Sequence, residues 1–184
     1  SYKDNISKNL EEIWETDTIG MPFIRGGKTF YYFNNGNLQQ NILMMQDCEL
    51  CEAEILLDPN NFSKDGTISL SSASVSPDGR LLAYSISDGG SDWRTWYVLD
   101  IDSKKKLDDV IEWSKFSYAT WESDSSGFYY QKYDKPDEAL ADVNKEPKLY
   151  FHSIGANQDN DDIEYADSTK PDWSWDISVP KKGD

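Results

Sequence analysis

The chain has 184 residues, of which 38% are hydrophobic and 14% aromatic, and its formal net charge is −16. This length accommodates one domain with a hydrophobic core, and the aromatic content excludes a disordered acidic tail. The negative charge argues against nucleic acid and anionic membrane surfaces as partners, because their phosphate groups would be repelled.

Residues 1–20 are predicted to form a helix and a lead-in. Ile6, Leu10 and Ile13 recur with helical spacing within residues 5–15. No basic segment followed by an apolar run marks a signal peptide, and no run approaches the ~20 apolar residues of a membrane span. The small number of cysteines favours a reducing compartment, so we expect a cytoplasmic protein. Because the chain does not begin with Met, its true N-terminus is expected to be missing, which leaves a periplasmic or secreted location open.

Residues 21–184 are predicted to form short strands separated by polar turns, which is typical of an all-β fold with meander connections. A lysine-rich linker is expected over residues 104–109, and a polar insertion over residues 134–146. The expected strands are 29–34, 41–46, 53–58, 67–75, 81–87, 94–101, 115–121, 127–133, 147–153 and 162–166.

A polar turn that ends in glycine and leads directly into an apolar strand recurs along the chain. Its glycines are Gly27, Gly79, Gly127 and Gly183, which lie about fifty residues apart. A repeat of this length built from short strands is typical of β-propeller blades. The copy at Gly183 predicts that a further blade begins there.

Cys48 and Cys51 are the only cysteines. Their spacing permits a redox pair or half of a zinc site. The acidic residues around them would raise the pKa of both thiols, and the only histidine, His152, lies far away in sequence. We therefore expect two reduced thiols in a loop between strands and no metal site.

Common catalytic and nucleotide-binding motifs are absent from the sequence. It contains neither the Gly-x-Ser-x-Gly elbow of α/β-hydrolases nor a phosphate-binding loop, so no cofactor is expected. A hairpin turn capped by Ser91 or Asp92 is predicted, and His152 is expected to be structural because no nucleophile is paired with it. The acidic residues between 159 and 164 are expected to form a solvated loop, since their spacing does not match a calcium-binding loop.

Five short segments occur in a familiar order: Phe33–Asn41, Leu57–Asn60, Ser63–Thr67, Gly90–Trp93 and Lys115–Ser117. Together they make the chain, from about residue 10 to its end, resemble the prolyl oligopeptidase family. The resemblance implies a partial β-propeller of about three four-stranded antiparallel blades out of seven. These blades are expected within residues 21–184.

The resemblance also implies a function. The family comprises serine peptidases that cleave short peptides after proline. An α/β-hydrolase domain carries the catalytic triad, and the propeller caps it and restricts access. No part of this chain matches the triad, so its catalytic residues are expected in a missing α/β-hydrolase domain. That domain and short proline-containing peptides are the expected partners, and the chain alone is expected to be inactive.

One residue can be carried over from the family. Phe116 matches a propeller phenylalanine that contacts the substrate upstream of the proline, in the third subsite. An aromatic ring suits this role, because it offers a large contact area at little cost in side-chain entropy. The residue pattern alone leaves open an ordinary inward-facing aromatic of a strand.

Two other functions remain open at this point. A small β-propeller could act without catalysis, as a protein-interaction module. The propeller could also come from a related dipeptidyl peptidase or an oligopeptidase-B-like enzyme. The first alternative depends on whether a catalytic domain follows in the reading frame. The second ranks lower because of the segments Leu57–Asn60 and Gly90–Trp93.

Overall fold

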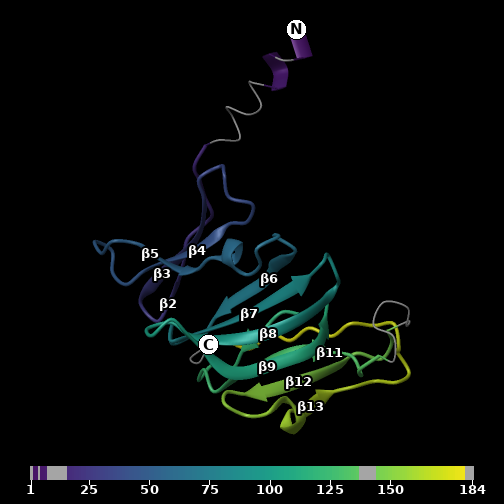
Figure 1. Cartoon of the computed structure of the whole chain (residues 1–184). Coiled ribbons are helices and arrows are strands. Elements are labelled where there is room, and N and C mark those ends of the chain that lie inside the picture. The colour runs from purple at the N-terminus through teal and green to yellow at the C-terminus, as the bar shows by residue number, and fades with distance from the viewer. Residues whose placement is uncertain (1, 4, 8–15, 137–143, 181–184) are drawn as a thin grey trace. The chain divides into compact units, whose positions relative to one another are not determined.

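The computed structural model describes residues 2–3, 5–7, 16–136 and 144–180. Residues 5–7 are helical, while residues 8–15 of the predicted helix lie outside the described residues. No helix in these ranges has the length and apolar character needed to cross a membrane. The strands in Figure 1 are β1 (Thr18–Ile19), β2 (Phe23–Arg25), β3 (Lys28–Asn34), β4 (Ile42–Gln46), β5 (Glu54–Leu57), β6 (Ile68–Val75), β7 (Leu81–Asp88), β8 (Trp93–Asp100), β9 (Lys105–Lys115), β10 (Thr120–Trp121), β11 (Gly127–Lys132), β12 (Lys148–Ser153) and β13 (Asp162–Tyr165). Two short 3-10 helices, η1 (Pro59–Asn61) and η2 (Gln158–Asn160), lie in connections.

The chain divides into two compact units, Ser1–Ser69 and Leu70–Asp184. The first contains an antiparallel sheet with the order β1-β3-β4-β5, and β2 also pairs with β3. Leu43 and Met45 of β4 are two residues apart and share one face, and Met45 lies opposite Phe30 of β3. All three side chains are buried and form part of the core of this unit.

The second sheet has the order β13-β12-β11-β9-β8-β7-β6, and β10 pairs with β11. Strands β6 to β9 pair in sequence order, and the later strands are arranged around β11, as in the small antiparallel sheets of propellers. Trp96, Phe128 and Tyr130 are fully buried in the aromatic core of this unit. The predicted all-β class with antiparallel meander connections is confirmed.

The longest strand, β9 (Lys105–Lys115), occupies the segment predicted to be a linker, so that prediction was wrong. Its side chains alternate, and Asp109 and Ile111 are buried between exposed neighbours. A charged residue on the buried face hides the period-two pattern by which a strand is recognised. The strand predicted over residues 115–121 was also wrong, because apart from Lys115, the last residue of β9, only the two residues of β10 are extended there.

Two of the recurring glycines are turn residues. Gly27 and Gly79 have φ angles of +80° and +73°, which a residue without a Cβ adopts at little cost. Gly183 lies outside the described residues. The predicted hairpin turn before β8 is present, and the Ser91 hydroxyl oxygen accepts a hydrogen bond of 3.1 Å from the Trp93 N–H.

Gly127 serves a different purpose from the turn glycines. It is the first residue of β11 and pairs with Ser153 of β12, while the left-handed turn position is taken by Ser125, with φ +63°. A Cβ on Gly127 would collide with the backbone carbonyl of His152 and with the Phe151 ring. Glycine is therefore required here by the close approach of β12.

Candidate functional site

Phe116 follows directly after β9 and lies outside any strand. Its φ is +52° and 57% of the residue is exposed. Trp113, within β9, also has a left-handed backbone, with φ +62°. Bulky residues rarely adopt this conformation, so the surrounding contacts must hold both of them in it. The structure thus exposes Phe116 to solvent. Phe116 is therefore not an inward-facing aromatic residue of a strand.

A pocket of about 190 Å³ lies beside Phe116. Tyr118 of the same loop, Tyr129 and Tyr130 of β11, and residues 174–177 form other parts of its wall. Ligand pockets for whole small molecules commonly reach several hundred Å³, so this pocket has room for about one side chain. Aromatic rings share its lining with polar side chains such as Ser117, Thr120 and Asp176, so the pocket offers both apolar contacts and hydrogen bonds.

Buried Gln131 connects three segments around the pocket. Its backbone N–H donates to the Ser117 hydroxyl (2.8 Å), and its side-chain amide donates to the Lys115 carbonyl (3.2 Å). Its side-chain oxygen accepts from the backbone N–H of Trp175 (2.6 Å). The Trp175 indole in turn donates to the Pro147 carbonyl (2.6 Å). Buried and satisfied polar groups of this kind specify one arrangement, so the pocket walls are pre-organised.

Lys115 lies next to the ring of Phe116. Its ammonium lies 5.5 Å from the centre of the Phe116 ring and 5.0 Å from that of Trp93. It also forms an ion pair with Asp92 at 3.7 Å. Cations are attracted to aromatic faces at these distances. Lys115 therefore helps to fix the direction in which Phe116 points.

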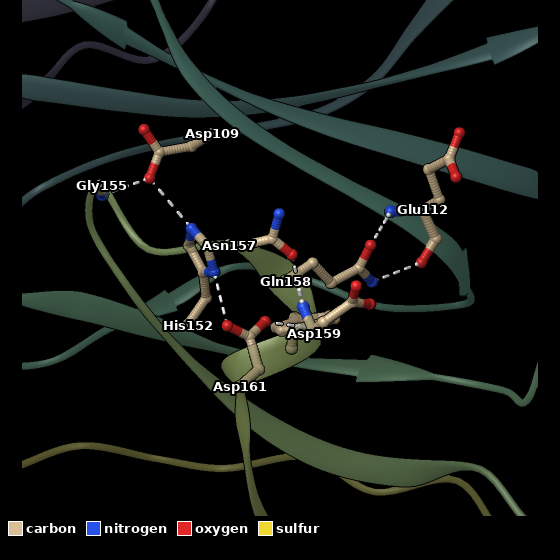
Figure 2. Close-up of polar contacts among 9 residues, drawn as sticks. Asp109, Glu112, His152, Gly155, Asn157, Gln158, Asp159 and Asp161 are labelled. Atoms are coloured by element: carbon tan, nitrogen blue, oxygen red, sulfur yellow. Dashed lines mark hydrogen bonds and ion pairs between the residues drawn. The ribbon is translucent and has the colours of Figure 1, made fainter.

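A buried ion cluster lies in the same unit (Figure 2). His152 of β12 is fully buried, with Nδ1 2.8 Å from Oδ1 of Asp161 and Nε2 3.0 Å from Oδ1 of Asp109. The Gly155 N–H also donates to Asp109 (2.6 Å), and the Tyr130 hydroxyl donates to Asp161 (2.7 Å). We call His152, Asp109 and Asp161 the ion cluster. Tyr130 joins it to the pocket, because the same residue lines the pocket wall.

The geometry favours a positively charged His152. Burial alone lowers the pKa of His152, but the hydrogen bonds and charges of Asp109 and Asp161 outweigh this effect and raise the pKa to about 9. Burial raises the pKa of Asp109, while the hydrogen bonds from His152 and Gly155 lower it overall. A cation between two carboxylates is therefore the stable form at neutral pH, which agrees with the structural role expected for His152.

The ion cluster predicts a stability that depends on pH. The folded-state pKa of His152, about 9, lies above its ordinary value of 6.5, so the protonated histidine favours the folded state. This contribution, on the order of 3 kcal/mol, is complete below about pH 6.5 and is lost as pH rises through 9. Thermal melts between pH 6 and 9.5 should show a falling Tm, and a His152→Gln variant should lack this slope. A flat wild-type profile would contradict a charged His152.

The loop after β12 was predicted to be simply solvated, and for Asp161 this was wrong, since only 1% of its side chain is exposed. The Asn157 side chain accepts from the Asp159 N–H and begins η2. Gln158 exchanges two hydrogen bonds of 3.0 Å with the backbone of Glu112 in β9 (Figure 2). Within the described ranges, no group of three or more His, Cys, Asp or Glu residues could hold a metal ion.

Cys48 and Cys51 form a disulfide, so the expectation of two reduced thiols was wrong. The Cys51 N–H donates to the Cys48 carbonyl at 3.0 Å, which closes a tight turn. This turn brings the two side chains together. The acidic neighbours influence the pKa of free thiols, but they do not prevent a disulfide that the backbone geometry permits.

Comparison with known proteins identifies the relatives of this chain. The family described as "Prolyl oligopeptidase, N-terminal beta-propeller domain" matches residues 1–184. A prolyl endopeptidase of Elizabethkingia meningoseptica is 41% identical over 164 residues, which cover 88% of this chain and 23% of that protein. Prolyl oligopeptidase A of Amanita bisporigera is 31% identical, over 88% of this chain and 25% of that protein.

Solved structures show the same similarity. A structure from a study of two prolyl endopeptidases superposes with a TM-score of 0.82 at 29% identity and covers 90% of this chain and 25% of its own. Prolyl oligopeptidase B of Galerina marginata, bound to a 35-residue hydrolysis and macrocyclization substrate, gives a TM-score of 0.80 at 26% identity, over 91% and 26%. The chain thus spans about a quarter of the length of the relatives that it matches.

Proposed function

Because the chain belongs to the prolyl oligopeptidase family and matches its N-terminal β-propeller domain throughout, we propose that it covers the active site of a serine peptidase. In this proposal the catalytic residues lie in an α/β-hydrolase domain of the same protein, which is the partner of the propeller. The propeller admits short proline-containing peptides and excludes folded proteins. The names of the relatives support this choice of substrate class.

The observation that carries the proposal is the exposed ring of Phe116 beside a pre-organised pocket. An exposed aromatic residue held in a left-handed backbone by hydrogen bonds and a neighbouring cation has little freedom to lose on binding. The pocket has room for about one side chain, as expected for one subsite of an extended peptide. We propose that Phe116 packs against a substrate residue upstream of the proline.

Replacing Phe116 with Ala is expected to weaken binding of a short proline-containing peptide by at least ~10-fold, because burying a phenylalanine side chain contributes about 1.5–3 kcal/mol. Binding can be followed by the change in tryptophan fluorescence, because Trp175 lines the pocket. Ile163→Ala is the matched control, since Ile163 is 56% exposed and does not line the pocket. Both variants should melt at the wild-type temperature.

The peptidase part of the proposal has its own assay. The chain alone should cleave no proline-containing peptide, and cleavage by the pure chain would refute the proposed division of roles. Equal peptide binding by wild type and Phe116→Ala would place the substrate contact elsewhere. Equally tight binding of peptides without proline would favour a protein-interaction module.

A further inference from the structure

The disulfide between Cys48 and Cys51 lies in the connection between β4 and β5. Cys48 is exposed, Cys51 is half-buried, and Leu50 between them is 95% exposed. A reagent in solution can therefore reach the disulfide without opening the sheet. Exposed disulfides of this kind are the labile ones in proteins, whereas buried ones resist reduction.

The turn that contains the disulfide is held by other contacts as well. The Gln46 side-chain amide donates to the carbonyl oxygens of Cys51 (2.6 Å) and Glu49 (3.3 Å). The flanking strands β4 and β5 pair as far as Met45 and Glu54. A disulfide that closes a loop of so few residues also constrains the unfolded chain very little. The fold therefore does not depend on this disulfide as a staple.

We propose that the Cys48–Cys51 pair is a thiol–disulfide exchange site, which dithiol reductants open and the disulfide form of the same reagent closes again, while the surrounding fold remains intact. It is independent of the peptide pocket and of the proposed peptidase role. The substrate class is a neutral or cationic dithiol, either a small molecule or a dithiol oxidoreductase.

The exchange proceeds in two balanced steps. A thiolate of the reductant attacks Sγ of the exposed Cys48, the disulfide bond breaks, and Cys51 leaves as a thiolate that takes a proton from water. The second thiol of the reductant then loses its proton and attacks the mixed disulfide, which releases Cys48 as a thiolate that is protonated in turn. The protein pair gains two electrons and two protons, and the reductant dithiol becomes a disulfide.

The charges around the pair select the reductant. The cysteines are flanked in sequence by the acidic residues Asp47, Glu49, Glu52 and Glu54, and Asp47 forms an ion pair with Lys28 at 3.3 Å. A negative surface slows the approach of anionic thiols such as glutathione and favours cationic ones.

The test is to treat the folded chain with dithiothreitol at pH 7, remove the reductant by anaerobic desalting and label free thiols at pH 7 with a high-mass maleimide. Two adducts should form without denaturant, and the circular dichroism spectrum and Tm should remain those of the oxidised chain. Labelling that appears only in denaturant would overturn the proposal. Loss of the fold on reduction, or in a Cys48→Ser/Cys51→Ser variant, would show a structural staple instead.

Charge selection is tested with two monothiols of opposite charge. Cysteamine, a cation, should form the mixed disulfide at least ~10-fold faster than glutathione, an anion, at equal thiolate concentration and low salt. A Glu49→Gln/Glu52→Gln variant should reduce this ratio, and so should added salt. Equal rates for the two thiols would overturn the proposed selectivity.

Discussion

Replacing His152 with Leu is expected to lower the free energy of unfolding of the unit Leu70–Asp184 by about 3–5 kcal/mol at pH 6. The change removes the cation and leaves the Asp109 and Asp161 carboxylates, 2% and 1% exposed, without their partner. An uncompensated buried charge is far more costly than the loss of an exposed ion pair. Urea unfolding followed by tryptophan fluorescence measures the difference.

The control for this variant is Lys145→Ala, which breaks the ion pair with Asp172. The two side chains lie 3.9 Å apart and are 55% and 78% exposed. Such a pair contributes less than about 1 kcal/mol. Adding Asp109→Asn to His152→Leu should restore part of the lost stability, because one uncompensated charge is removed. If His152→Leu cost no more than Lys145→Ala, the ion cluster would not stabilise the fold as its geometry indicates.

Replacing Gly127 with Ala is expected to cost about 3 kcal/mol or more, since overpacking against backbone cannot be relieved by a change of rotamer. The added Cβ would collide with the His152 carbonyl and the Phe151 ring. Relief requires β11 and β12 to separate at the end where Gly127 pairs with Ser153. The loss appears in urea unfolding and as faster amide hydrogen exchange in these two strands.

Gly155→Ala separates this steric effect from ordinary backbone strain. Gly155 has φ +82°, and no atom lies within 4 Å of the position that a Cβ would take. Only the left-handed conformation opposes alanine there, at a cost of about 1–2 kcal/mol. A similar loss in the two variants would mean that strand packing is not what requires glycine at position 127.

The strands that could be predicted from the sequence are those that follow a polar turn and consist of an apolar run of residues. The turn that ends in Gly79 and the apolar run after it specify β7 locally. β9 was missed because its buried face carries Asp109, which reads as a surface residue until its partner is known. That partner, His152, lies 43 residues further along the chain, and no local propensity records such a contact.

The candidate site likewise contains residues that the sequence indicated and residues that only the structure revealed. Phe116 could be found from a family resemblance in Lys115–Ser117, whereas its own propensity placed it in a strand. The left-handed backbone that exposes its ring results from contacts made by Gln131 and Lys115 and not from any preference of phenylalanine. Asp161 was missed because an aspartate in an acidic segment carries no sign of burial. The disulfide was missed because it requires a backbone turn, which the spacing of Cys48 and Cys51 in the sequence does not specify.

The ion cluster also has a consequence for the order of folding. Hairpins such as β7–β8 close short loops and can form early, whereas the bonds from Asp109 to His152 and Gly155 span 43 and 46 residues. Closing such loops costs entropy before any contact compensates for it, so these bonds form late. Interactions that are absent from the folding transition state lower the unfolding rate and hardly change the folding rate. We therefore expect the buried histidine to slow the unfolding of this unit while leaving its folding rate almost unchanged, which the rates of urea-induced unfolding and refolding of His152→Gln would test.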